Sequence, residues 1–130
     1  KTEIEASLVA VSEDHDLALL KADGCRTPYI KPGEPGGITQ GMRVFAIGSP
    51  LGVSDSVSSG IVSGYDDAYI RTDAKIYLGN SGGPLVTTDG KVIGINTLKL
   101  ITQKFEGMGF AIPLSLAFRE FSTYLKTNPW

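Results

Sequence analysis

Residues 79–85 read Gly-Asn-Ser-Gly-Gly-Pro-Leu, so that Ser81 stands among three glycines. A serine hydroxyl is a weak nucleophile until a neighbouring base removes its proton. Flanking glycines let a substrate backbone approach closely and let the chain adopt unusual φ values. The N–H groups of Gly79 and Ser81 could converge on an oxyanion. The stretch therefore predicts a nucleophilic serine, although a bare match of this kind equally fits a glycine-rich turn with an ordinary serine.

Two classes of hydrolase share the spacing Gly79-x-Ser81-x-Gly83, and the order of the other catalytic residues separates them. In an α/β-hydrolase a helix follows the serine, and the acid and the histidine come later in the chain. Here no helical pattern follows Gly83, and no histidine lies after Ser81. In the trypsin-like order the histidine and the aspartate both precede the serine. Asp16 does so, at the head of the apolar run 17–20.

The rest of the chain has the pattern of an all-β protein with one C-terminal helix. Short apolar runs between turns predict strands at residues 4–10, 17–20, 42–47, 57–63, 68–72, 84–88, 91–98 and 105–112. Asp89 and Gly90 predict a tight hairpin, and Gly60 indicates a bulge or a close backbone approach. Apolar residues at helical spacing predict a helix over 114–126, its core face made of Leu114, Ala117, Phe118, Phe121 and Leu125.

Composition limits the classes of function. The chain has 130 residues, a net charge of −2 and 42% hydrophobic residues, which suits a globular domain and not a disordered or fibrous chain. The near-neutral balance argues against nucleic acid as the main partner. No apolar run is long enough to span a bilayer, and no signal peptide opens the chain. One cysteine cannot form an intrachain disulfide, and one histidine excludes a site that needs two.

Seven ordered motifs together resemble the HtrA/Deg family of trypsin-like serine proteases. They cover essentially the whole chain, at residues 16–21, 46–52, 59–63, 72–74, 79–85, 92–97 and 109–113. The resemblance implies two antiparallel β-barrels with the active site between them, the second barrel complete and the first only partial. It also implies remnant first-barrel strands at 1–25, a Pro- and Gly-rich inter-barrel linker at 26–41, and the second barrel with its helix at 42–130.

The same resemblance implies roles for individual residues. Ser81 matches the nucleophile and Asp16 the acid that orients the histidine of the triad. Gly79 and Ser81 match the oxyanion-hole donors. Ile76 and Thr97 fall where the family lines its specificity pocket. Residues 96–98, which are Asn96, Thr97 and Leu98, match the strand that pairs with the substrate backbone.

The family's catalytic histidine lies upstream of the aspartate, where this chain does not reach. His15 is a poor substitute, because neighbouring side chains on a strand point to opposite faces. We therefore expect a serine endopeptidase that cleaves unfolded proteins through an acyl-enzyme, with this chain inactive by itself. Two alternatives stay open: a pseudoprotease that serves as a peptide-binding scaffold, and a short natural protein that borrows a histidine from a partner.

The resemblance also implies the setting of the parent protein. Family members act on polypeptide substrates outside the cytoplasm or in organelles, commonly form trimers and often carry a following PDZ domain. Serine-triad chemistry needs no cofactor or metal, and no ligand cluster occurs in the sequence. Strands in 1–25 would lack their barrel partners, so we expect this segment to be disordered or paired with another copy.

Overall fold

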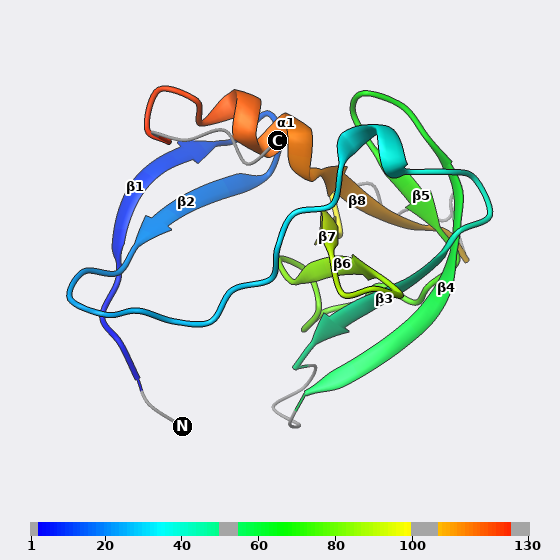
Figure 1. Cartoon of the computed structure of the whole chain (residues 1–130), viewed down its shortest axis with the longest axis horizontal. Coiled ribbons are helices and arrows are strands. Elements are labelled where there is room, and N and C mark those ends of the chain that lie inside the picture. The colour runs from blue at the N-terminus through cyan, green and yellow to red at the C-terminus, as the bar shows by residue number, and fades with distance from the viewer. Residues whose placement is uncertain (1–2, 50–54, 100–106, 126–130) are drawn as a thin grey trace.

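The computed structural model describes residues 3–49, 55–99 and 107–125 and consists mostly of strands (Figure 1). The elements in chain order are β1 (Ser7–Ser12), β2 (Leu17–Lys21), the 3-10 turn η1 (Pro35–Gly37), β3 (Arg43–Gly48), β4 (Ser56–Tyr65), β5 (Ile70–Thr72), β6 (Pro84–Thr87), β7 (Val92–Thr97), β8 (Gly109–Pro113) and α1 (Leu114–Glu120). The prediction of an all-β protein with one C-terminal helix is confirmed. α1 has seven residues, and within the described part no helix is long and apolar enough to cross a membrane.

Six strands close into an antiparallel barrel in the order β3-β4-β5-β8-β7-β6. Alternate side chains of each strand point inward, which buries Val44, Val62, Ile70 and Leu85 completely. β6 and β7 form the hairpin that Asp89 and Gly90 predict. The closed barrel is the complete second barrel that the sequence indicates.

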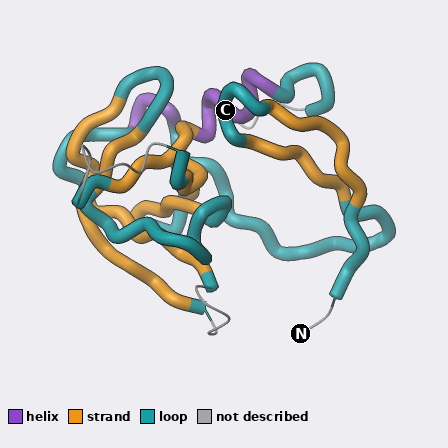
Figure 2. Tube along the Cα trace, turned by 180° about the vertical axis from the view of Figure 1, so that it is seen from behind, coloured by secondary structure: helices purple, strands orange, loops and turns teal. Residues whose placement is uncertain are grey.

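A separate two-stranded sheet, β1 with β2, lies beside the barrel, and the long connection from β2 leads across to β3 (Figures 1 and 2). One face of the β1–β2 sheet packs against α1, and Leu17 is buried in that contact. Leu8, Val11 and Leu20 are each more than half exposed. Over residues 7–21 the two strands pair with each other, so the expectation of disorder is wrong there; pairing with another copy stays a prediction.

The Pro- and Gly-rich connection is partly ordered by the barrel. Pro32 forms an isolated parallel bridge with Val92 at the start of β7. The N–H of Gly33 donates to the Val92 carbonyl at 2.8 Å, and the Val92 N–H donates to Lys31 at 3.0 Å. These bonds attach the second half of the connection to β7, whereas residues 21–31 are exposed.

The C-terminal helix is shorter than the predicted 114–126. It ends at Glu120, and turns follow in which Ser122 donates to Arg119 and Tyr124 to Phe121. Ser and Thr at 122 and 123 are weak helix formers, so the apolar spacing outlasts the helix itself. Position 126 lies outside the described residues. The predicted apolar face does pack inward, but it omitted Leu116, which is also buried.

Two strand details correct or refine the sequence-based picture. The first strand begins at Ser7 and not at residue 4. The last one begins at Gly109, and residues 105 and 106 of its predicted range lie outside the described part. Gly60 marks a close approach, since a Cβ there would overlap Ala74 and the Asp73 carboxylate. The register shift in β4 falls further along, between Val62 and Gly64.

Candidate functional site

Ser81 lies in a tight, exposed turn that leads into β6. Gly79 and Gly82 take φ values of 107° and 88°, a region that side chains rarely adopt, so these two glycines shape the turn. Asn80 anchors it from inside. Its Oδ1 accepts the Tyr77 N–H at 2.9 Å, and its Nδ2 donates to the Lys75 carbonyl at 3.1 Å.

The turn is packed against β3. The Ser49 N–H donates to the Gly79 carbonyl at 3.1 Å. A Cβ at Gly83 would overlap the Ile47 carbonyl oxygen, and a Cβ at Gly48 would overlap Asn80. Gly83 is therefore required by its contact with β3 of the barrel. Gly79 and Gly82, with their positive φ values, are required by the conformation of the turn.

β7 holds the other side of the turn through Asn96. The Gly82 N–H donates to the Asn96 carbonyl at 2.7 Å, and the Asn96 N–H donates to Gly83 at 2.8 Å. The Asn96 side chain donates to the Pro84 carbonyl at 3.1 Å. Both main-chain groups of this predicted substrate-pairing residue are thus already bonded to the serine turn, so any pairing with substrate falls to the residues that follow it.

Asp16 is hydrogen-bonded to the same strand, β7, at the residue that follows Asn96. Thr97 Oγ1 donates to Asp16 Oδ2 at 2.8 Å, between residues 81 positions apart in the chain. The Thr97 side chain is buried, and its Oγ1 also accepts the Lys99 N–H at 3.0 Å. Neighbouring residues of β7 therefore bind the serine turn and the aspartate, which brings the two predicted catalytic residues to one region.

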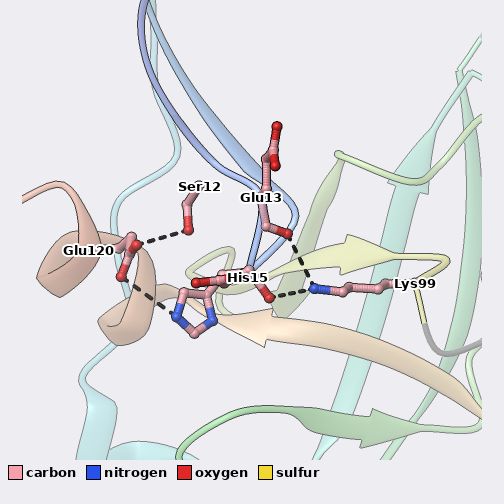
Figure 3. A network of polar contacts seen from close by, with 6 residues as sticks. Ser12, Glu13, His15, Lys99 and Glu120 are labelled. Atoms are coloured by element: carbon pink, nitrogen blue, oxygen red, sulfur yellow. Dashed lines mark hydrogen bonds and ion pairs between the residues drawn. The ribbon is translucent and has the colours of Figure 1, made fainter.

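His15 points away from this region, as expected, toward α1 (Figure 3). Its Nε2 lies 3.6 Å from Glu120 Oε2. The reason differs from the one the sequence suggests, because Asp16 is not in a strand. It ends the turn between β1 and β2 with a φ of 57°, and this left-handed conformation turns its carboxylate toward Thr97.

Two backbone donors near Ser81 are the predicted oxyanion-hole donors. Over the described residues, neither the Gly79 nor the Ser81 N–H donates a hydrogen bond to another part of the chain. Ser81 is exposed, so a carbonyl oxygen of a substrate has access to its turn. Backbone donors held in place before the reaction are what stabilises a developing oxyanion.

The predicted pocket residues are more deeply placed than the sequence suggests. Ile76 is 8% exposed and belongs to the barrel core, and Leu98 packs against that core. Their roles in selecting substrate stay predictions. Asn80, and Thr97 as the donor to Asp16, are the residues that sequence reasoning missed. Asn80 acts through local bonds to residues three and five positions before it, whereas Thr97 acts through a bond to a residue 81 positions away, which no local pattern indicates.

The first 95 residues match the family model of the trypsin-like peptidase domain, and the chain belongs to that family. Within it, the chain groups with the HtrA/DegP serine endoproteases. It is 42% identical over 138 residues to the probable periplasmic serine endoprotease DegP-like of Pseudomonas putida (strain W619), covering 98% of this chain and 28% of the relative. It is 43% identical over 128 residues to the serine protease Do-like HtrA of Bacillus subtilis (strain 168), covering 86% and 28%.

A solved structure of the same family has a similar fold. The HtrA-type protease AlgW, solved with a decapeptide, superposes with a TM-score of 0.83 at 40% identity, over 94% of this chain and 41% of that chain. The resemblance found from the motifs is confirmed. The chain spans less than a third of the length of the two curated relatives.

Proposed function

We propose that this chain is the catalytic part of a serine endopeptidase that cleaves unfolded polypeptides through an acyl-enzyme. The observation that carries the proposal is the convergence on β7, where Thr97 binds Asp16 and Asn96 binds the turn of Ser81. The proposed nucleophile and the proposed orienting carboxylate come from distant parts of the chain and are bonded to neighbouring residues of β7, which supports a shared catalytic site.

In the proposed reaction Ser81 Oγ attacks the carbonyl carbon of the scissile peptide while a histidine accepts its proton. The N–H groups of Gly79 and Ser81 stabilise the oxyanion. The histidine then gives the proton to the leaving amine, and water hydrolyses the resulting ester by the reverse sequence. Asp16 orients that histidine. His15 is excluded from this role because it contacts Glu120 on the other side of the turn.

Because the histidine must come from outside this chain, we propose that the 130 residues alone are inactive. We also propose Ile76 and Thr97 as pocket residues, and Asn96, Thr97 and Leu98 as the strand beside the substrate backbone, where main-chain pairing with substrate would involve the residues after Asn96. The decapeptide in the AlgW structure and the periplasmic relatives support a polypeptide substrate and an extracytoplasmic setting. A trimeric parent, a following PDZ domain and the division at 1–25, 26–41 and 42–130 remain proposals.

The proposal is tested by supplying the missing part. The segment of the Bacillus subtilis relative that precedes its matched region is fused ahead of residue 1 to supply a histidine, and casein cleavage is measured for the chimera, for its Ser81→Ala variant and for the isolated chain. We expect turnover in the chimera alone. Replacing Asp16 by Asn should reduce it by several orders of magnitude, because the imidazole loses its orienting partner.

Two results would overturn the proposal. One is robust Ser81-dependent turnover by the isolated chain, which would contradict its expected inactivity. The other is a folded chimera that binds an unfolded polypeptide without cleaving it, which would favour the peptide-binding scaffold. Thermal unfolding of the chimera shows whether it is folded.

A further inference from the structure

The turn that carries Asp16 is held by the C-terminal helix. Glu120, the last residue of α1, contacts the turn through both carboxylate oxygens (Figure 3). Ser12 Oγ donates to Oε1 at 2.8 Å, and His15 Nε2 lies 3.6 Å from Oε2. Ser12 is only 5% exposed and the Glu120 side chain is 37% exposed, so the hydrogen bond is shielded from water on the Ser12 side alone. Glu120 thus contacts Ser12, the last residue of β1, and His15, the third residue beyond it.

The barrel holds the opposite side of the same turn. Lys99, two residues past Thr97, directs its ammonium at main-chain oxygens of the turn. It donates to the Glu13 carbonyl at 3.3 Å and also to the carbonyl of Asp14. These bonds use backbone atoms, so Lys99 fixes the path of the chain directly before His15 and Asp16.

Asp16 needs such support because its backbone is strained. It is the one residue other than glycine with a positive φ in the part of the chain that the structure describes. Aspartate is one of the few residues with a side chain that enter the left-handed region, and the remaining cost of that conformation is offset by contacts with the surroundings. The local hydrogen bond is long, 3.4 Å from the Asp16 N–H to the Glu13 carbonyl. Because the turn's own hydrogen bond is long, the contacts of Ser12, His15 and Lys99 supply the stabilisation that this bond does not.

We propose that Glu120 is a positioning residue for Asp16. It acts through Ser12 and His15 to keep the turn in the conformation that directs the Asp16 carboxylate at Thr97. The proposal rests on the role of Asp16 in the proposed peptidase, and it adds the end of α1 to the structure that sets the triad. Glu120 itself touches neither substrate nor Ser81.

Two substitutions separate the two contacts of Glu120. Glu120→Ala removes the acceptor of Ser12 and the partner of His15. Glu120→Gln keeps an amide oxygen as an acceptor for Ser12 and loses the charge that faces His15. Glu34→Ala is the matched control, because Glu34 is exposed in the inter-barrel connection and makes no side-chain capping bond.

The first measurement uses NMR on the 130-residue chain, where no catalysis is needed. A positive φ brings the Hα and the amide proton of one residue close together and gives a strong intraresidue NOE. We expect Asp16 to lose this NOE in Glu120→Ala, to keep part of it in Glu120→Gln, and to keep all of it in Glu34→Ala. Unchanged amide shifts in β5 (Ile70–Thr72) show that the barrel is intact.

The second measurement uses the chimera described above. A misplaced orienting carboxylate lowers kcat by about ten- to a hundredfold in Glu120→Ala, with KM unchanged because substrate contacts are not altered. Glu120→Gln should recover part of kcat. A general loss of stability would instead lower the amount of active enzyme, which active-site titration measures separately.

An Asp16 NOE of wild-type strength in both Glu120 variants, with kcat unchanged, would overturn the proposal. If Glu120→Ala does not fold, Glu120→Gln decides by the same two readouts. A further outcome is a chimera that shows no Ser81-dependent cleavage while the Asp16 NOE of the 130-residue chain still responds to Glu120. That result would contradict the proposed peptidase and leave the positioning of Asp16 by Glu120 supported.

Discussion

Thr97 shows how one hydroxyl connects two distant parts of the molecule. It is buried in β7, and it donates to Asp16 Oδ2 at 2.8 Å. The sequence identifies both residues through the family motifs and assigns Thr97 to a pocket wall. In the structure its hydroxyl is directed at the aspartate, so its first effect is on the position of that carboxylate.

Thr97→Val should lower the free energy of unfolding by about 1–3 kcal/mol. The valine has the same shape but leaves the Asp16 carboxylate and the Lys99 N–H without a partner. Urea unfolding followed by circular dichroism measures the difference. Thr88→Val is the control, since Thr88 is exposed in the β6–β7 turn. Equal losses in the two variants would contradict the structural role of the hydroxyl.

Gly83 is constrained by its contact with β3, because a Cβ there would overlap the Ile47 carbonyl oxygen. Gly83→Ala should therefore destabilise the chain by about 1–3 kcal/mol or more, through displacement of the serine turn or of β3. Gly36→Ala is the matched control, because nothing lies within 4 Å of a Cβ at that position and its φ is not positive. Thermal unfolding midpoints would decide, and a Gly83→Ala midpoint equal to the control would exclude the overlap.

The connection between β4 and β5 is closed by one carboxylate. The Tyr69 and Ala68 N–H groups donate to Asp66 Oδ1 at 2.9 and 2.8 Å. These two backbone donors hold the pKa of Asp66 below its ordinary value of 3.8, with a smaller contribution from Arg71 and a small opposing effect of burial. The turn therefore depends on the ionised form of a residue that lies on the surface.

Stability should depend on pH through Asp66 with a defined sign. Because its pKa is lower in the folded state, the carboxylate stabilises the fold above the unfolded pKa, and this contribution is lost as pH falls through the folded value. Solvent screening at this exposed site limits the effect to about half a kcal/mol. Urea unfolding from about pH 6 to pH 2 should show a smaller loss for Asp66→Asn than for wild type. Asp67→Asn should follow the wild type, and coincident slopes for all three proteins would refute the assignment.

The molecule consists of a closed barrel and a two-stranded sheet that differ in how much surface they expose. The barrel pairs every one of its strands on both sides. The sheet of β1 and β2 is bonded to no other strand of the described part, and it carries the exposed side chains of Leu8, Val11 and Leu20. Unpaired strand edges with apolar side chains favour association with another chain.

We therefore predict that the isolated chain self-associates through this sheet. Sedimentation velocity over a concentration series should show a rising average mass for the wild type. Leu8→Lys should weaken association by at least about tenfold, because it replaces a 62% exposed leucine with a charge. Tyr29→Lys is the control, at a 77% exposed position in the inter-barrel connection. A wild type that stays monomeric throughout would contradict the prediction.

Local patterns were enough to predict the strands and the serine turn, whereas the barrel class followed from the resemblance of the ordered motifs to a known family. Alternation of apolar residues, the Asp89-Gly90 turn and the glycines around Ser81 are each encoded within a few neighbouring residues. The same local pattern overestimated the helix, because apolar spacing continues past Glu120 although the residues that follow turn away. The sequence indicates that the glycines around Ser81 leave space for a substrate, and the structure shows that Gly83 is also needed to fit against Ile47.

Contacts between distant residues were decided by the tertiary structure alone. The Thr97–Asp16 bond spans 81 positions and the Ser12–Glu120 bond spans 108, and neither leaves a periodic signal in the sequence. Such pairs depend on barrel closure and on where α1 lies against the β1–β2 sheet, which are set by the packing of the whole chain. The candidate catalytic residues can therefore be proposed from motifs in the sequence, whereas the residues that contact and position them become visible only once the chain has folded.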